Sequence, residues 1–159
     1  EHLFFQAKNN PEVFFIGSEV YMSGIGTLIG NIQKEEISNI KIFPDDIRIL
    51  LDENKDKQIF DAVKIICPDP WPKERHHKRR LINADFLKLL HNSIKADGNL
   101  YISTDWADYA ESIKETLNQS TYFESSKDFF LQKESLTKFE QRGKDEGREI
   151  FEFNFQKKD

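Results

Sequence analysis

The sequence predicts an α/β fold with a mostly parallel sheet, helices on both faces of that sheet and an antiparallel strand at the C-terminal end. One observation is that short runs of β-branched and aromatic residues alternate with stretches whose apolar residues recur at helical spacing. The other is that residues 149–155 alternate phenylalanine with polar residues, which is the period of a half-buried antiparallel strand. Together they indicate repeated strand–helix units that end in a reversed strand.

Each element of this fold follows from a local pattern. Strands are expected in four apolar runs before the last one: 13–19, 39–43, 61–67 and 98–104. Helices are expected where apolar residues recur every three to four positions: at the N-terminus around residues 3–7, from residue 23, and over 46–51, 84–95 and 106–117. Asn83 is the expected N-cap of one helix. The segments 68–80 and 127–147 are expected to have little regular structure.

Length and composition indicate a soluble protein of one domain over residues 1–159. The chain has 38% hydrophobic and 32% charged residues and no apolar run near the roughly 20 residues that span a bilayer. Its single cysteine, Cys67, fits a reducing compartment such as the cytoplasm. Because the chain opens without methionine inside a helical pattern, we expect an N-terminal part of the protein to precede Glu1. The sequence does not decide between a monomer and a homodimer.

Acidic residues follow the predicted strands at their carboxyl ends. Glu19 closes the first strand, and Asp45, Asp69 and Asp105 follow the next three. Ligands of open α/β sheets bind outside these ends, so the acids are candidates for one site. Glu19 is suited to accept both hydroxyls of a ribose, and Asp45 is a weaker candidate beside an adenine. Acids also cap helices, and Asp46 has that alternative role next to Asp45.

A basic cluster lies in the segment 67–80 (CPDPWPKERHHKRR), directly after the third predicted strand. Five lysines and arginines and two histidines fall within eight residues: Lys73, Arg75, His76, His77, Lys78, Arg79 and Arg80. The chain as a whole has a formal net charge of −5, so this cluster predicts a polyanion whose phosphates bind here. A solvated helix face is the alternative. No cysteine or acid lies at ligand spacing to the histidines, so no metal is expected.

Three segments resemble motifs of the bacterial tRNA (guanine-N7-)-methyltransferases: 68–81 (PDPWPKERHHKRRL), 103–110 (STDWADYA) and 137–147 (TKFEQRGKDEG). Their order and spacing also match, and with GSEVY at 17–21 the resemblance covers essentially the whole chain. It implies the Rossmann-like class I fold of S-adenosylmethionine-dependent methyltransferases. It also implies S-adenosylmethionine as cofactor and methyl transfer to N7 of a guanine in the variable loop of tRNA. The family's first strand and Gly-rich cofactor loop would lie before Glu1.

The resemblance implies roles for the matched residues. Asp69 is implied to be the catalytic acid and to lie near the cofactor, for which Glu19 and Asp45 are the other candidate ligands. Substrate contacts are implied for Lys73, Asp105, Thr137, Lys138, Phe139 and Glu140. Guanine N7 is nucleophilic without losing a proton, so the reaction requires mainly alignment and stabilisation of the positive charge that develops on the purine. Asp69 fits that role, and the alternative is that it only shapes its turn.

Further alternatives stay open at this point. Asp105 or Glu140 can accept hydrogen bonds from guanine N1–H and N2–H, and Trp71 or Trp106 can stack on a base, although Trp106 also fits a helix core. The second candidate function is a non-catalytic RNA-binding module derived from this fold. A third, another Rossmann-like nucleotide enzyme, is supported by the fold alone.

Overall fold

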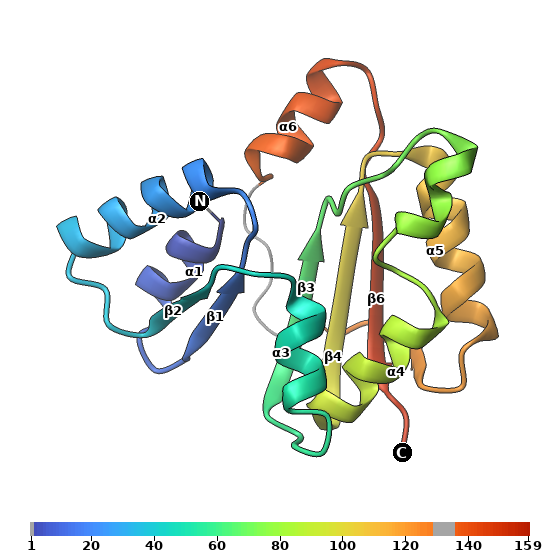
Figure 1. The fold of residues 1–159 in the computed structure, drawn as a ribbon, viewed down its shortest axis with the longest axis horizontal. Coiled ribbons are helices and arrows are strands. Elements are labelled where there is room, and N and C mark those ends of the chain that lie inside the picture. The colour runs from blue at the N-terminus through green and yellow to red at the C-terminus, as the bar shows by residue number, and fades with distance from the viewer. Residues whose placement is uncertain (1, 129–135) are drawn as a thin grey trace. The chain divides into compact units, whose positions relative to one another are not determined.

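The computed structural model describes residues 2–128 and 136–159, and the chain divides into two compact units, Glu1–Glu53 and Asn54–Asp159 (Figure 1). A single domain over residues 1–159 stays a prediction. Within the described residues, no helix is long and apolar enough to cross a membrane.

The first unit contains a two-stranded parallel sheet with three helices. Its elements are α1 (His2–Asn9), β1 (Phe15–Ser18), α2 (Met22–Lys34), β2 (Ile40–Phe43) and α3 (Ile47–Glu53). Ser18 pairs with Phe43, so the two strands end at the same level and present their carboxyl ends together. The Asn39 side chain donates to the backbone carbonyls of Ala7, Asn10 and Val13 at 2.8–3.0 Å and thereby ties α1 to the sheet. All five elements were predicted.

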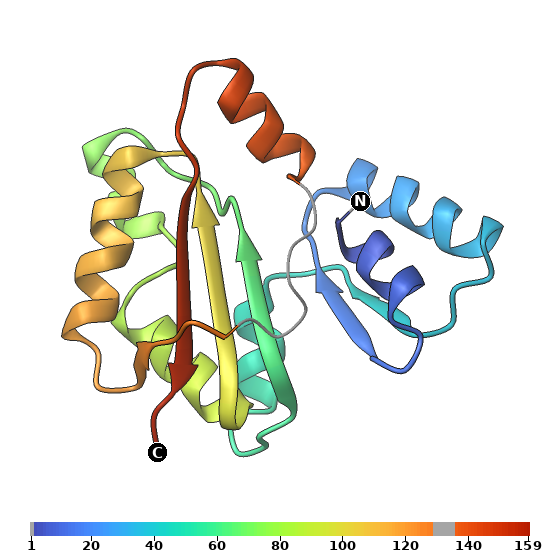
Figure 2. The ribbon, with the colours of Figure 1, turned by 180° about the vertical axis from the view of Figure 1, so that it is seen from behind.

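The second unit contains a four-stranded mixed sheet in the order β3-β4-β6-β5 (Figure 2). Its elements are β3 (Phe60–Ile66), the 3-10 helix η1 (Glu74–Arg79), α4 (Ala84–Ser93), β4 (Ile94–Thr104), α5 (Ala107–Gln119), β5 (Phe123–Ser125), α6 (Lys138–Asp145) and β6 (Phe151–Lys157). β3 and β4 are parallel, whereas β6 is antiparallel to both β4 and β5. The reversed C-terminal strand is therefore confirmed. Over the described residues, parallel and antiparallel pairs are more evenly mixed than the predicted mostly parallel sheet.

The core of the second unit lies where α4 and α5 pack near the central strand β4. Leu100 and Ile102 of β4 are fully buried, and so are Leu87 of α4 and Ile113 of α5. Each such side chain contributes roughly 1.5–3 kcal/mol to folding by leaving water. Asn83 caps α4 as predicted, because its Oδ1 accepts a hydrogen bond from the Phe86 amide at 2.9 Å.

Three details of the predicted elements were wrong. The helix expected over 84–95 ends at Ser93, because Ile94 pairs with Phe60 and begins β4. The segment 68–80 contains η1. The segment 127–147 contains α6, and its residues 129–135 lie outside the described part of the chain. β5 was not predicted, since three residues are too few for a periodic pattern.

Candidate functional site

The turn after β3 presents an acidic side chain at the carboxyl end of that strand. Asp69 is exposed, and its Oδ1 accepts a long hydrogen bond of 3.4 Å from the Trp71 amide. Cys67 and Trp71, on either side, have φ values of 48° and 43°, in the left-handed region that non-glycine residues rarely adopt. Such conformations persist only where surrounding contacts impose them, and they cluster at functional sites.

η1 carries most of the basic cluster on an exposed 3-10 turn. Four cations are exposed and are called the basic patch from here on: Lys73, Arg75, Lys78 and Arg79. The Arg79 guanidinium lies over the Trp71 ring, 4.9 Å from its centroid, and the His76 ring meets Trp71 edge to face at 5.8 Å. One cation of the basic patch and a histidine therefore contact an aromatic ring, an arrangement that suits a nucleic acid with phosphates and bases.

Arg80 differs from the basic patch because its side chain points into the protein and is only 5% exposed. Its Nε donates to the Pro70 carbonyl at 2.9 Å and its Nη2 to Asp108 Oδ2 at 2.5 Å. Its guanidinium also lies over the Tyr109 ring, 4.7 Å from the centroid. This burial speaks against the predicted phosphate contact of Arg80.

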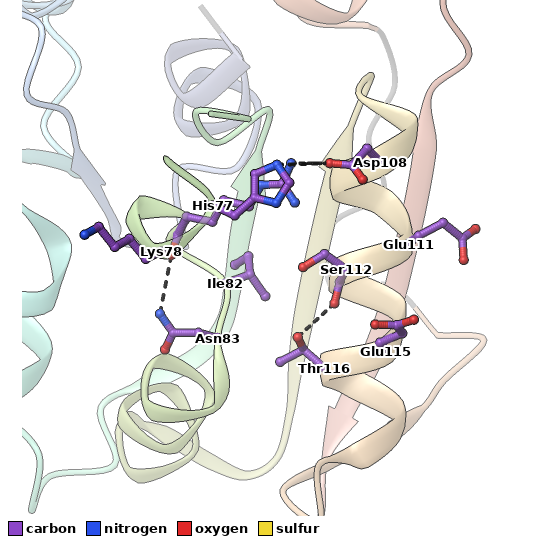
Figure 3. Close-up of a pocket in the computed structure, with 10 residues that line it drawn as sticks. His77, Lys78, Ile82, Asn83, Asp108, Glu111, Ser112, Glu115 and Thr116 are labelled. Carbon is purple, nitrogen blue, oxygen red and sulfur yellow. Dashed lines mark hydrogen bonds and ion pairs between the residues drawn. The ribbon is translucent and has the colours of Figure 1, made fainter. Parts of the chain in front are cut away.

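A polar cavity of about 440 Å³ lies between the η1 segment and α5 (Figure 3). His77 and Asp108 point toward one another at its upper end, with Nε2 and Oδ2 3.5 Å apart. Ser112 and Thr116 line it farther along α5. The hydrogen bond from Arg80 holds the pKa of Asp108 below its usual value, which favours the ionised carboxylate beside the Arg80 guanidinium.

The first turn of α6 uses two of the predicted substrate-binding residues as a capping box. Thr137 Oγ1 accepts from the Glu140 amide, and Glu140 Oε2 accepts from the Thr137 amide at 2.8 Å. Glu140 Oε1 accepts from Ser103 Oγ at 3.0 Å, and the Glu140 side chain is fully buried. Lys138 and Phe139 between them are exposed, Phe139 by 70%. Of the four predicted substrate-binding residues 137–140, Lys138 and Phe139 are the ones with exposed side chains.

Asp105 lies at the carboxyl end of β4 and already has a cationic partner. Its Oδ2 accepts from Arg148 Nε at 2.8 Å, and Arg148 also pairs with Glu146. α6 approaches Asp105 closely at Gly143, where an added Cβ would lie 2.6 Å from Asp105 Oδ2. The Arg148 guanidinium lies 6.0 Å from the Trp106 ring centroid, and Trp106 is half-buried at the start of α5. Asp105, Trp106 and α6 thus form one contiguous region.

The two acids of the first unit lie at the carboxyl ends of β1 and β2, as predicted. Glu19 Oε1 accepts from the amides of Val20 and Tyr21, each at 2.9 Å, which fixes an exposed carboxylate at the strand end. The Ser18 hydroxyl donates to the Asp45 carbonyl at 2.9 Å and joins the two strand ends. A carboxylate that accepts hydrogen bonds fits the hydroxyl donors of a ribose. Asp46 caps α3, since its Oδ1 accepts from the Arg48 amide.

Sequence reasoning missed the residues that hold the predicted ones in place: Ser103, Asp108, Gly143 and Arg148. These contacts join segments far apart in the chain, so no local sequence pattern predicts them. Across the described part of the chain, no group of three or more His, Cys, Asp or Glu side chains could hold a metal ion.

Comparisons with known proteins agree with this architecture. A family model described as "Putative methyltransferase" matches residues 1–153. The chain is 41% identical over 152 residues to a tRNA (guanine-N(7)-)-methyltransferase of Nitrosomonas europaea, covering 94% of this chain and 68% of the relative. It is 40% identical over 158 residues to the enzyme of that name from Nitrosococcus oceani, covering 99% and 67%.

Among solved structures, a putative methyltransferase of Streptococcus mutans in complex with SAH superposes with a TM-score of 0.54 at 10% identity, covering 90% of this chain and 75% of that one. At this identity the likeness shows the fold alone. The protein therefore has the Rossmann-like fold of S-adenosylmethionine-dependent methyltransferases, and the chain belongs to the tRNA (guanine-N7-)-methyltransferase family.

Proposed function

We propose that this protein transfers a methyl group from S-adenosylmethionine to N7 of a guanine in the variable loop of tRNA. The observation that carries the proposal is the exposed Asp69 on a constrained strand-end turn, immediately followed in sequence by the basic patch. The named relatives and the family model support the same activity. A tRNA substrate also favours the cytoplasm as the place of action.

The basic patch supports the RNA side of the proposal. Its four cations are exposed and can neutralise phosphates, which supplies affinity with little sequence information. Trp71 lies among them, and stacking on a base contributes roughly 1–3 kcal/mol. His76 and His77, which are half-buried on η1, complete the proposed RNA contacts of this segment.

Asp69 is proposed to act on the reacting base. S-adenosylmethionine, when bound, supplies an electrophilic methyl group on a sulfonium. Guanine N7 attacks with its own lone pair, so no base needs to remove a proton first. The Asp69 carboxylate stabilises the positive charge that develops on the purine, an electrostatic effect that preorganised groups provide most efficiently. The Asp69 side chain is exposed, and the residues with positive φ values on either side of it define the turn that carries it.

The remaining proposed contacts divide between the two units. In the first, Glu19 accepts the ribose hydroxyls of the cofactor and Asp45 lies near its adenine. In the second, Lys73, Asp105 and Phe139 are proposed to contact the substrate. Lys138 is exposed beside Phe139 and is proposed to contact it as well. For Thr137 and Glu140 the proposal is indirect, because their side chains organise the turn that presents Lys138 and Phe139.

The test is transfer of a radiolabelled methyl group to tRNA by the full-length protein and its Asp69→Ala and Asp69→Asn variants. We expect both variants to lose roughly 10²–10³-fold in kcat, the scale of one lost electrostatic stabiliser, while tRNA affinity changes little. Asp56→Asn, at an exposed acid before β3, is the matched control and should keep the wild-type rate.

Two outcomes would contradict the proposal. If the wild-type protein binds tRNA but leaves it unlabelled, the protein is an RNA-binding module. If Asp69→Ala methylates tRNA at the wild-type rate, Asp69 only shapes its turn.

A further inference from the structure

We propose that Arg80 is a positioning residue, which holds the Asp69 turn against the first turn of α5 and does not bind phosphate. The inference rests on the proposed function, because it assigns Arg80 a task in presenting Asp69 to the substrate. It also gives different roles to two adjacent arginines, Arg79 and Arg80, which the sequence alone does not distinguish.

The contacts of Arg80 are those of a structural clamp. The guanidinium is 95% removed from solvent and makes three different contacts: with the Pro70 carbonyl, with Asp108 and with the Tyr109 ring. Tyr109 is itself fully buried, and its hydroxyl accepts a hydrogen bond from the Ile82 amide at 3.1 Å. The anchor for Arg80 is therefore a rigid part of the core.

The Asp69 turn depends on such an external contact. Pro68 and Pro70 have no amide donors, so the turn can make few hydrogen bonds of its own. Within the turn, the Asp69 carboxylate accepts a hydrogen bond from the Trp71 amide, and this bond is long. Two residues in left-handed conformations add strain of the order of 1 kcal/mol each. Arg80 Nε holds the carbonyl of Pro70, the residue directly after Asp69, so moving that carbonyl moves Asp69.

Only arginine can make this set of contacts. Its planar fork donates to Pro70 and Asp108 from two different nitrogens while its flat face lies on Tyr109. A lysine keeps the charge but has one nitrogen and no flat face. The change Arg80→Lys should therefore loosen the turn without removing the cation, and the same change at Arg79 should matter little to phosphate binding.

The kinetic experiment compares matched substitutions at Arg79 and Arg80 in the full-length protein. We expect Arg80→Lys to lower kcat for tRNA methylation by roughly 10–10²-fold with little change in KM, because misplacing a reacting group by about 1 Å costs this much. We expect Arg79→Ala, but not Arg80→Ala, to reduce the salt slope of tRNA binding by roughly 1. If Arg80→Lys keeps the wild-type kcat, or if Arg80→Ala reduces the salt slope as Arg79→Ala does, the inference is overturned.

A second readout does not depend on activity. In a Trp106→Phe background Trp71 is the one tryptophan left within residues 1–159, and the quenching is measured against a Trp71→Phe reference, so the difference in fluorescence reports the turn. Arg80→Lys should make Trp71 more accessible to acrylamide, whereas Lys114→Ala, at an exposed cation of α5, should not. Unchanged quenching in Arg80→Lys would overturn the inference, whether or not the protein is active on tRNA. Inactivity of the wild-type protein on tRNA would contradict the proposed function but not this inference. If Arg80→Lys does not fold, Asp108→Asn tests the same clamp from α5, with the same two outcomes.

Discussion

Two of the three segments that carry matched motifs in the second unit, 68–81 and 137–147, use their polar residues in opposite ways. On η1 the side chains of the basic patch are exposed, whereas at the start of α6 the motif residues Thr137 and Glu140 bond to one another and to Ser103. The difference teaches that a motif marks where a site lies but does not say which members touch the ligand. Burial and hydrogen-bond partners separate the two roles.

The largest effect on stability is expected at the buried motif residue of α6, Glu140. Glu140→Ala removes the carboxylate that accepts from the buried Ser103 hydroxyl and from the half-buried Thr137 amide. We expect the free energy that opposes local opening of α6 to fall by about 2–3 kcal/mol. Hydrogen exchange of the α6 amides measures this, with an acceleration of roughly 10²-fold. Glu140→Gln, which keeps acceptor oxygen at the site, is the control and should exchange more slowly than Glu140→Ala. Unchanged exchange would mean that the capping box is not what holds α6.

A smaller effect is expected where α6 meets Asp105. Gly143→Ala places a Cβ 2.6 Å from Asp105 Oδ2 and 2.9 Å from Asp105 Cβ, so helix or side chain must shift. We expect a loss of about 1–3 kcal/mol in the free energy of unfolding, measured by urea denaturation. Gly26→Ala in α2 is the matched control, because nothing lies within 4 Å of its added Cβ. That control should be stabilising by up to about 1 kcal/mol. Equal stability changes in the two variants would contradict close packing at Gly143.

The smallest effect on stability is expected in the basic patch. Lys78→Ala removes an exposed cation and should change the free energy of unfolding by no more than about 0.5 kcal/mol. The same variant should lower the salt slope of tRNA binding by roughly 1, measured by filter binding over a range of KCl concentrations. A large stability loss with an unchanged salt slope would mean that Lys78 supports the fold and does not bind phosphate, as is expected of the buried residues of α6.

The described strands other than β5, and most helices, could be predicted because their apolar residues have a clear period. α6 was missed for the opposite reason, since most of its eight residues are polar and Phe139 is exposed. A signal was nevertheless present: Thr137 followed by Glu140 three positions later is the pattern of a capping box. η1 follows a turn with three prolines, 68–72, and lacks any apolar period. It could not be predicted from pattern alone.

The positions of the candidate acids at the strand ends could be predicted from the sequence, but the residues that hold the site in place could not. Strand-end position, which depends on local pattern, made Asp69 and Asp105 candidates together with Glu19 and Asp45, and their separate roles came from the family resemblance. The partners of these regions lie far along the chain: Arg80 and Asp108 are separated by 28 positions, and Asp105 and Arg148 by 43. Such pairings arise from the packed fold, so the sequence could not distinguish Arg80 from Arg79.

The clamp of Arg80 on α5 has a consequence for protein engineering. A designer who moves the segment 67–80 onto another α/β scaffold transfers a buried guanidinium with it. Without Asp108 and Tyr109 the guanidinium would keep the Pro70 carbonyl but lose its carboxylate partner, and a buried charge without a counter-charge destabilises a protein by several kcal/mol. The smallest portable unit is therefore two pieces of chain, the loop and the first turn of α5.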